Sequence, residues 1–262
     1  MKIAVIALNE CGRKIGERLT EELKEDAVLY VPQRFRQNKS SPRIRHYSED
    51  LSSLTGKIFH QYDGLVFVMA LGIVIRVIAP HIKNKLTDPA VVVVDDVGRY
   101  AVSLLSGHEG GANGLAIRVA NILGSEPVIT TGSEARKDLI VGVGCRKGIS
   151  AAYVKEAIIG ALKEAGCAKE AVRFIATVDL KSKEKGLLDA ASMLGIPIRI
   201  ISKEEIASCA KSYSPSRLVT ERLGIGGVCE PAALLGGRRT RLILKKKIHK
   251  GVTVAIAREN FS

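Results

Sequence analysis

Residues 90–131 read "AVVVVDDVGRYAVSLLSGHEGGANGLAIRVANILGSEPVITT", and this stretch decides the fold. Two β-branched, apolar arms around the turn "DDVG" predict a β-hairpin. The glycine-rich loop "SGHEGGAN" comes next, followed by a segment with helical periodicity and by the strand-like "EPVITT". A strand that leads through a loop into a helix and then into another strand is the repeating unit of α/β proteins.

The same alternation continues on both sides of this stretch. We therefore expect an α/β fold with two domains, each a mostly parallel sheet flanked by helices, with the β-hairpin inserted in the N-terminal domain. Further strands are expected at 2–8, 27–32, 62–70, 139–145, 172–178, 196–202, 241–247 and 252–257, and helices at 13–25, 71–82, 113–124, 150–166, 185–195, 216–224 and 230–236. Residues 34–50 are polar, basic and rich in turn-forming residues.

One polar joint, "GSEARKD" at 132–138, separates the two halves. The charge changes at the same place: 18 Lys and Arg stand against 16 Asp and Glu before residue 139, and 22 against 11 from there on. We therefore expect an N-terminal domain at 1–132, a linker at 133–138 and a basic C-terminal domain at 139–262.

A surface this positive attracts ligands with several negative charges, such as nucleic acids, anionic membranes or small molecules with many carboxylates or phosphates. Aromatic residues make up only 4% of the chain and tryptophan is absent, so side chains for stacking single-stranded bases are scarce. No zinc finger, basic zipper or ribonucleoprotein motif is present. We expect a small polyanionic ligand and no nucleic acid partner.

The cysteines are odd in number and contain no C-x-x-C pair; they stand at 11, 145, 167, 209 and 229. This pattern predicts free thiols in a reducing cytosol and no zinc ribbon. The first ten residues turn polar too quickly for a signal peptide, and the apolar run at 64–75 is too short to cross a membrane. We expect a cytoplasmic protein that does not bind membranes.

Two glycine-bearing loops of the C-terminal half stand where open α/β sheets collect ligands. In "VGVGCRKGIS" (141–150) the spacing is G-x-G-x-x-x-G, and the acidic Asp179 comes later than a ribose-binding residue should. Three interpretations of this loop remain: a nucleotide-binding loop, a tight strand-to-helix turn, and a carboxylate clamp made by Arg146, Lys147 and backbone N–H groups. In "ERLGIGGVCEPAALLGG" (221–237), a structural turn and a ligand loop are equally supported.

The third loop, "SGHEGGAN", is not a P-loop, because it has no lysine, and not a zinc-protease motif, because Ala112 stands four residues after His108. Two interpretations remain. In the first, Ser106, His108 and Asn113 cap the following helix. In the second, His108 is a base near neutral pH, and the glycines let backbone N–H groups face an oxyanion.

Several strings together resemble one family. "GLVFVMALGIVIRVIAP", "KLTDPAVVVVDDVGRYAVSLLSGHEGGAN" and "LGSEPVITT" are similar to the N-terminal module of the cobalt-precorrin-5A hydrolases of anaerobic cobalamin biosynthesis. "VGVGCRKGIS", "DLKSKEKGLLDAASMLGIP", "GVCEPAALL" and "VTVAIA" resemble their C-terminal module. These segments cover most of the chain. The chain departs from many members of the family in lacking most of the region between the modules, because "TGSEARKDLI" joins them almost directly.

The resemblance implies a hydrolase of vitamin B12 synthesis. Its substrate is a cobalt-bound tetrapyrrole with many carboxylates and a δ-lactone, which water opens with release of acetaldehyde to give cobalt-precorrin-5B. No cofactor and no protein metal site are expected, since the substrate carries the cobalt. Neighbouring enzymes of the cobalamin pathway are the other expected partners. A non-catalytic carrier of corrinoid intermediates is the alternative.

Candidate site residues follow from the loops and the resemblance together. His108, paired with Glu109, is expected to deprotonate the attacking water, and Glu109, Asp95 or Asp96 to protonate the ring carbon. The aliphatic surface expected under the macrocycle includes Leu71, Ile73 and Val74. The residues expected to bind the substrate are Gly72, Arg76, Arg99, Ser106, Gly107, Gly110, Gly111, Asn113, Gly144, Arg146, Lys147, Lys181, Glu184 and Glu230.

Overall fold

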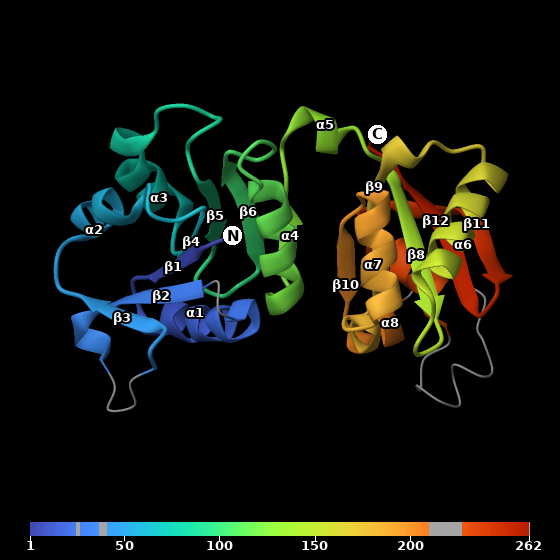
Figure 1. Cartoon of the computed structure of the whole chain (residues 1–262), viewed down its shortest axis with the longest axis horizontal. Helices are drawn as coiled ribbons and strands as arrows, with labels where there is room; N and C mark the ends of the chain where they lie inside the picture. The colour runs from blue at the N-terminus through green and yellow to red at the C-terminus, as the bar shows by residue number, and fades with distance from the viewer. Residues whose placement is uncertain (25–26, 37–40, 210–226, 262) are drawn as a thin grey trace. The chain divides into compact units, whose positions relative to one another are not determined.

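The computed structural model describes residues 1–24, 27–36, 41–209 and 227–261 (Figure 1). The chain forms two compact units, Met1–Thr131 and Gly132–Ser262. The second unit begins with the short helix α5 (Gly132–Ala135), so that the residues expected as a linker are partly helical. Each unit has its own sheet and its own apolar core, as the α/β fold class predicted from the sequence requires.

The N-terminal unit is built on a seven-stranded sheet with the order β3-β2-β1-β4-β5-β6-β7. All neighbouring strands are parallel except β5 and β6, which form the expected hairpin. The strands are β1 (Ile3–Ala7), β2 (Ala27–Pro32), β3 (Ile44–Tyr47), β4 (Gly64–Val68), β5 (Ala90–Val94), β6 (Tyr100–Leu105) and β7 (Glu126–Val128).

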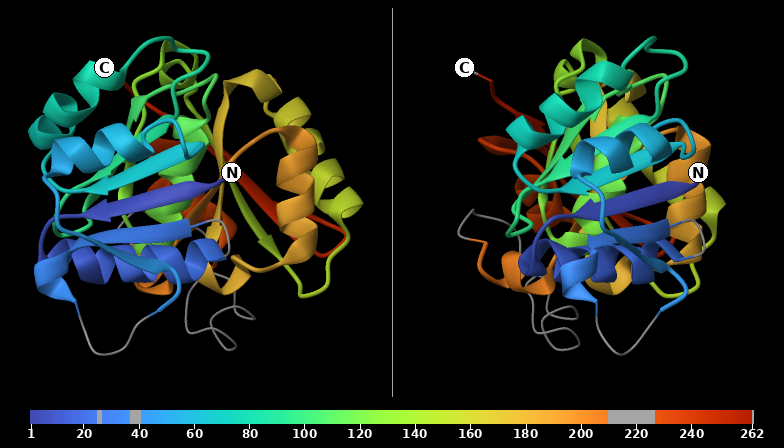
Figure 2. Two further views of the ribbon diagram at one scale, coloured as in Figure 1. Left: turned by 60° about the vertical axis from the view of Figure 1, so that its left-hand side comes forward. Right: turned by 90° about the vertical axis from the view of Figure 1, so that its left-hand side faces the viewer.

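Helices cover both faces of this sheet (Figures 1 and 2). One face packs against α1 and α4, and the other against α2 and α3. Because both faces are covered, β1, β4 and β5 are buried along their whole length, which explains their continuous apolar runs. The helices are α1 (Glu10–Leu23), α2 (Leu51–Ile58), α3 (Leu71–Ile78) and α4 (Ala112–Leu123), with short 3-10 turns η2 (Gln33–Phe35) and η3 (Ala79–His81).

The direction of β6 sets the place of the glycine loop. In the antiparallel pair, Val94 lies opposite Ala101 and Val91 opposite Leu105, so β6 ends where β5 begins. The strands β1, β4 and β5 begin at one edge of the sheet, which we call the amino edge; it includes residues 1–2, 63 and 88–89. The edge at which they end, with residues 8–9, 69–72 and 95–99, is the carboxyl edge. The "SGHEGGAN" loop lies at the amino edge.

Two elements of this unit were not indicated by the sequence pattern. Strand β3 forms within the polar stretch 34–50, and α2 forms just after it. Because β3 is the edge strand of the sheet, only Tyr47 of its four residues is buried, and the apolar alternation of a typical strand is weak. Helix α2 begins at Asp50, whose side chain caps it by accepting the N–H of Ser53.

The C-terminal unit has a five-stranded sheet with the order β10-β9-β8-β12-β11. The first three strands are parallel, whereas β12 runs antiparallel to β8 and β11 antiparallel to β12. Both sheets of the α/β fold are therefore mixed, and this one ends in a second hairpin. The strands are β8 (Leu139–Cys145), β9 (Val172–Val178), β10 (Ile198–Ile201), β11 (Thr240–His249) and β12 (Val252–Glu259).

Helices α6 and α7 cover one face of this sheet, and α10 covers the other. Gly142 on β8 allows the close approach of α10, since a Cβ there would lie 1.8 Å from the carbonyl oxygen of Cys229. The helices are α6 (Ala151–Glu164), α7 (Lys185–Leu194), α8 (Lys203–Ala207) and α10 (Cys229–Leu235), with 3-10 turns η4 (Lys169–Ala171) and η5 (Asp179–Lys181). The expected helix at 216–224 lies outside the described residues. No described helix has the length and apolar character needed to span a bilayer.

Candidate functional site

The loop between β6 and α4 is a compact turn. Ser106, its first residue, has a left-handed backbone with φ of 55°, which is strained for any residue other than glycine. The carbonyl oxygen of Ser106 accepts the N–H of Gly110 at 3.1 Å and that of Ala112 at 3.2 Å. Gly111 precedes α4 with φ of 84°, a conformation that only glycine adopts freely. The glycines therefore let the chain reverse between strand and helix.

A second glycine allows close packing of the loop. A Cβ at Gly110 would lie 2.5 Å from the Cβ of Ser106 and 3.3 Å from the carbonyl oxygen of Asp88. The loop is thus pressed against the segment 82–89 that leads into β5. Lys85 Nζ of that segment also pairs with Glu109 Oε1 of the loop at 3.2 Å.

Asn113 ties the first turn of α4 to its surroundings. Its Oδ1 accepts the hydroxyl hydrogen of Ser103 at 2.8 Å, and its Nδ2 donates to Thr131 Oγ1 at 2.9 Å. Asn113 is buried, so its side chain holds the loop and is not presented to a ligand. No side chain caps α4, and the capping interpretation of Ser106, His108 and Asn113 is therefore wrong.

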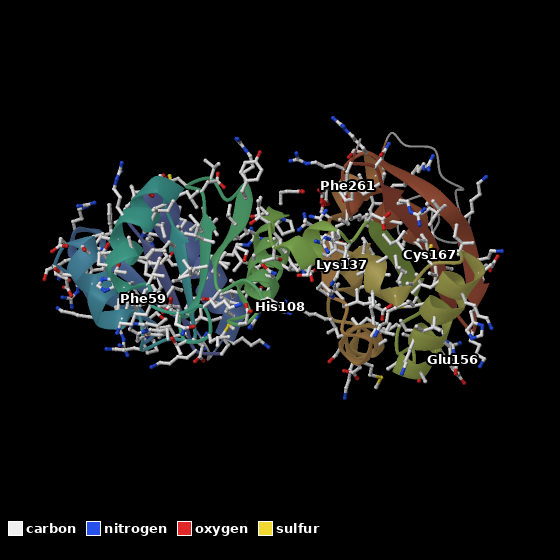
Figure 3. The ribbon with its side chains drawn as sticks, turned by 90° about the horizontal axis from the view of Figure 1, so that it is seen from above. Phe59, His108, Lys137, Glu156, Cys167 and Phe261 are labelled. Atoms are coloured by element: carbon white, nitrogen blue, oxygen red, sulfur yellow. The ribbon has the colours of Figure 1, made fainter. Side chains whose placement is uncertain are left out.

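His108 and Glu109 project from this loop and are exposed. Figure 3 shows His108 near the green part of the ribbon, apart from Phe59 in the blue-green part. Among the described residues, the backbone N–H groups of Gly107 and His108 have no hydrogen-bond acceptor. The loop thus presents an imidazole and two free N–H donors on one short segment.

Glu109 is engaged elsewhere. Hydrogen bonds from its own backbone N–H and from Lys85 hold the pKa of the Glu109 carboxyl below its usual value, and the nearby His108 adds to this. A carboxyl with a lowered pKa stays ionised at neutral pH and is a weak proton donor. The expected pairing with His108 is not among the hydrogen bonds of the described residues, since the carboxylate pairs with Lys85 instead.

The other candidates of the N-terminal unit lie at the carboxyl edge, with Gly72 and Arg76 on α3 and Arg99 before β6. The six residues of β6 lie between Arg99 and Ser106, so that seven steps of extended chain, about 23 Å, separate the two. Asp95 and Asp96 lie at the carboxyl edge too, where Asp95 Oδ1 accepts the N–H of Tyr100 at 2.7 Å. These two carboxyl groups thus lie at the opposite edge of the sheet from His108, and their expected role as proton donors stays a prediction. The reason for this separation is the antiparallel direction of β6.

The carboxyl edge has two cavities, and His108 lines neither. One, of about 370 Å³ and largely apolar, is lined by Met69, Ala70, Leu71, Val93, Asp95, Tyr100, Val102 and Val128. The other, of about 360 Å³, is lined by Leu8, Pro32, Gln33, Arg34, Tyr47, Ser48, Glu49, Asp50 and Leu51. Leu71 and Ile73 are exposed beside the first cavity, whereas Val74 is fully buried in the core and offers no surface to a macrocycle. Burial raises the pKa of Tyr47, at the second cavity, to about 12.

The C-terminal unit brings most of its candidates together where β8 and β9 end. Gly144 ends the buried part of β8, and the exposed Arg146 and Lys147 follow it. Glu184, from the segment after β9, accepts the N–H of Gly148 at 3.0 Å and so joins the two loops. Burial raises the pKa of the adjacent Cys145 thiol to about 11, against the charge of Lys181, which lowers it. The cluster presents cations at the surface beside a partly buried thiol.

Two candidates of this unit have a packing role. A Cβ at Gly144 would lie 2.7 Å from Thr253 Oγ1, so the glycine accommodates β12. Glu230 is only 2% exposed, and its Oε1 accepts the backbone N–H of Lys246 at 2.9 Å, which fixes α10 against β11. This contact gives Glu230 a role in packing, and its expected substrate-binding role stays a prediction. Gly224 and Gly226 of the second glycine loop lie outside the described residues.

Three residues that shape the loop were missed by the sequence analysis: Lys85, Asp88 and Thr131. Each stands in a polar turn at the end of an apolar run. Such a turn indicates a loop, but the partner of its side chains depends on which strands are neighbours. Among the described residues, no group of three or more His, Cys, Asp and Glu side chains could hold a metal ion.

Comparisons with known proteins find family matches in both units. The family model described as cobalamin synthesis G N-terminal matches residues 53–134, and the one described as cobalamin synthesis G C-terminus matches residues 139–257. The chain is 28% identical over 352 aligned positions to the cobalt-precorrin-5A hydrolase of Priestia megaterium, covering 97% of this chain and 94% of that protein. It is 23% identical to that of Salmonella typhimurium, with 97% of each chain covered.

A shorter relative is protein CobE of Sinorhizobium sp, which is 32% identical over 127 residues, covering 48% of this chain and 82% of CobE. The alignment with the Priestia megaterium protein has more positions than the 262 residues of this chain, so that protein contains residues without a counterpart here. This agrees with the short connection between the two modules.

Proposed function

The chain belongs to the cobalamin synthesis G family, and we propose that it is a cobalt-precorrin-5A hydrolase. It opens the δ-lactone of the macrocycle with water and releases acetaldehyde, giving cobalt-precorrin-5B. The observation that carries the proposal is the exposed His108 on a loop that also offers the free N–H groups of Gly107 and His108. Base and oxyanion donors on one rigid turn are what ester hydrolysis requires.

The first step is the attack of water on the lactone carbonyl. Neutral His108 accepts a proton from the water as its oxygen bonds to the carbonyl carbon. The carbonyl oxygen becomes an oxyanion, which the N–H groups of Gly107 and His108 stabilise. The ring then opens as the acyl carbon–oxygen bond breaks, leaving a carboxyl group and an alkoxide on the carbon that carries the methyl group.

The second step releases acetaldehyde. The alkoxide forms a carbonyl as the bond to the ring carbon breaks, and the electron pair goes to that ring carbon. The imidazolium of His108 returns its proton there, so that one water is consumed and the base is restored. This assignment replaces Asp95 and Asp96, which lie at the opposite edge of the sheet, and Glu109, whose carboxylate is ion-paired with Lys85.

The basic C-terminal unit binds the peripheral carboxylates of the substrate. Arg146 and Lys147 are exposed at the end of β8, and Lys181 stands beside them. Guanidinium and ammonium groups pair well with the carboxylates of such a macrocycle. The substrate carries the cobalt, and none of the steps above uses a metal ion bound by the protein. The five free thiols support a cytoplasmic location.

The test is an acetaldehyde assay on the purified protein with cobalt-precorrin-5A. We expect release by the wild type, and a loss of about 10²–10⁴-fold in kcat for His108→Ala, because the general base is removed. The matched control is His249→Ala, since His249 is also exposed but pairs with Glu156 in the other unit. Near-normal release by His108→Ala would contradict the assignment. Tight binding of the substrate without release would identify a carrier.

A further inference from the structure

Two side-chain oxygens at the amino edge are buried and have no hydrogen-bond partner among the described residues: Ser106 Oγ and Asp88 Oδ1. Ser106 is 8% exposed and Asp88 only 3%. Buried polar atoms are almost always hydrogen-bonded, because a lost bond to water is costly in an apolar interior. Two such atoms in neighbouring segments therefore indicate an interaction that the proposed mechanism does not yet use.

The two residues flank the same glycine. A Cβ at Gly110 would meet the Cβ of Ser106 on one side and the backbone carbonyl oxygen of Asp88 on the other, at 2.5 Å and 3.3 Å. The ion pair between Lys85 and Glu109 joins the same two segments on the outside. The loop that carries His108 is thus held against the segment of Asp88 at two points.

Asp88 is fixed through one carboxylate oxygen. Its Oδ2 accepts the N–H groups of Lys83 at 2.9 Å and of Asn84 at 3.0 Å, which closes the turn before β5. The other oxygen, Oδ1, is left as an acceptor in a fixed place. A turn of this kind needs only one oxygen, so the second one is free for another task.

Ser106 is the residue whose conformation aims the loop. Its left-handed backbone directs the following N–H groups of Gly107 and His108. A strained backbone of this kind persists only where surrounding contacts hold it. Its hydroxyl is buried and has no hydrogen-bond partner among the described residues, so it is the side-chain group left to provide such a contact.

We propose that Asp88 is a positioning residue for this loop: one bound water joins its Oδ1 to the Ser106 hydroxyl, donating to the carboxylate and accepting from the hydroxyl. Asp88 thereby holds Ser106 in its left-handed conformation and keeps the two N–H donors and His108 aimed at the lactone. This inference rests on the proposed hydrolase activity for its catalytic consequence. The Asp88–Ser106 interaction itself does not depend on the reaction.

The substitution Asp88→Asn separates the two tasks of the carboxylate. The amide oxygen can take the place of Oδ2 and accept both backbone N–H groups, while the amide nitrogen replaces the acceptor Oδ1 with a donor. Ser106→Ala removes the hydroxyl from the other side. The matched control is Asp63→Asn, because Asp63 is an exposed carboxylate at the same edge that accepts the N–H of Lys2 and does not contact the loop.

The experiment measures kcat and KM for acetaldehyde release in the two single variants, the double variant and the control. We expect each single substitution to lower kcat about 10–100-fold with little change in KM, because catalytic groups are misaligned while binding groups remain. The double variant should lose no more than the worse single variant, since both changes remove the same interaction. Losses that multiply, or an Asp88→Asn variant within about twofold of wild type, would overturn the proposal.

A second measurement keeps the two proposals distinguishable. The amides of Gly110 and Ala112 donate to the Ser106 carbonyl. Their hydrogen exchange should be roughly tenfold faster than wild type in either single variant, and the double variant should exchange no faster than the single variants. Asp63→Asn should leave it unchanged. If the wild type releases no acetaldehyde but this exchange pattern is found, the hydrolase proposal fails and the Asp88–Ser106 interaction stands. Unchanged exchange in Asp88→Asn would overturn the interaction even in an active hydrolase.

Discussion

The two edges of the N-terminal sheet differ in what their loops present. The carboxyl edge has the two cavities described above and the exposed Leu71 and Ile73, but two of its acidic side chains are already engaged, Asp95 with the N–H of Tyr100 and Asp96 with Asn9. The amino edge has the exposed imidazole and two N–H groups that have no acceptor among the described residues. In an open parallel sheet, ligands gather at the carboxyl edge. One antiparallel strand places the loop that carries His108 at the opposite edge.

The glycines of the two edges also differ, in how closely other atoms surround them. Gly110 at the amino edge is enclosed, whereas a Cβ at Gly72 on the carboxyl edge would have nothing within 4 Å. An enclosed glycine is required by the packing of the chain itself. A glycine that faces open space is not required in this way. A larger side chain should therefore lower activity and stability at Gly110 and change them little at Gly72.

The largest effect is expected for Gly110→Val. A branched side chain there collides with Ser106 and the Asp88 backbone and separates the loop from its support. We expect a loss of about 100-fold in kcat and a decrease of about 1–3 kcal/mol in the free energy of unfolding. Acetaldehyde release and urea unfolding measure the two effects. Gly114→Ala, on the exposed side of α4 with nothing within 4 Å, is the control and should stabilise by about 0.5–1 kcal/mol.

A smaller effect is expected for Lys85→Gln. The ammonium helps to hold the pKa of Glu109 below its usual value, so its removal should raise that pKa toward the value of an isolated glutamate. A carboxyl whose pKa is lowered by folding stabilises the fold at pH above its unfolded value, and this contribution is lost as the pH falls through its folded pKa. In Lys85→Gln the free energy of unfolding should therefore fall less steeply as the pH drops through the pKa of Glu109. An NMR titration of Glu109 that is identical in both proteins would show that the ion pair does not form.

The smallest effects are expected at the carboxyl edge. Gly72→Ala and Arg99→Ala should leave kcat within about twofold of wild type and change the free energy of unfolding by less than about 1 kcal/mol. A Cβ at Gly72 would meet open space, and the exposed Arg99 side chain contacts the exposed ring of Tyr100. The acetaldehyde assay and thermal unfolding check this. A loss of turnover comparable to that of His108→Ala would show that the reaction takes place at this edge, and would reverse the assignment of the two edges.

Much of the fold could be predicted from local pattern. Continuous apolar runs predicted β1, β4 and β5, because helices cover both faces of those strands. The hairpin was predicted by its turn, and the basic loop after β8 by its composition. Strand β3 was missed because an edge strand needs few buried residues, and the antiparallel pairing of β12 with β8 leaves no mark in either strand.

The candidate site was only partly predictable. The sequence singled out His108 and its glycines because imidazole and glycine have distinctive chemistry wherever they stand. The partners of that loop, Lys85, Asp88 and Thr131, come from segments that the sheet order brings beside it. Arg99 and Ser106 are seven residues apart in the chain, yet the extended strand between them puts them at opposite edges.

The sequence by itself determined the α/β class, the two modules, the basic charge of the second one and the loop that carries the imidazole. Each of these depends on residues that are near one another in the chain, whose apolar periodicity and turn preferences act locally. The tertiary structure alone decided which edge that loop serves, which acidic groups are out of its reach, and which buried oxygens support it. Those depend on strand order and direction, which are set by long-range packing that no short stretch of sequence encodes.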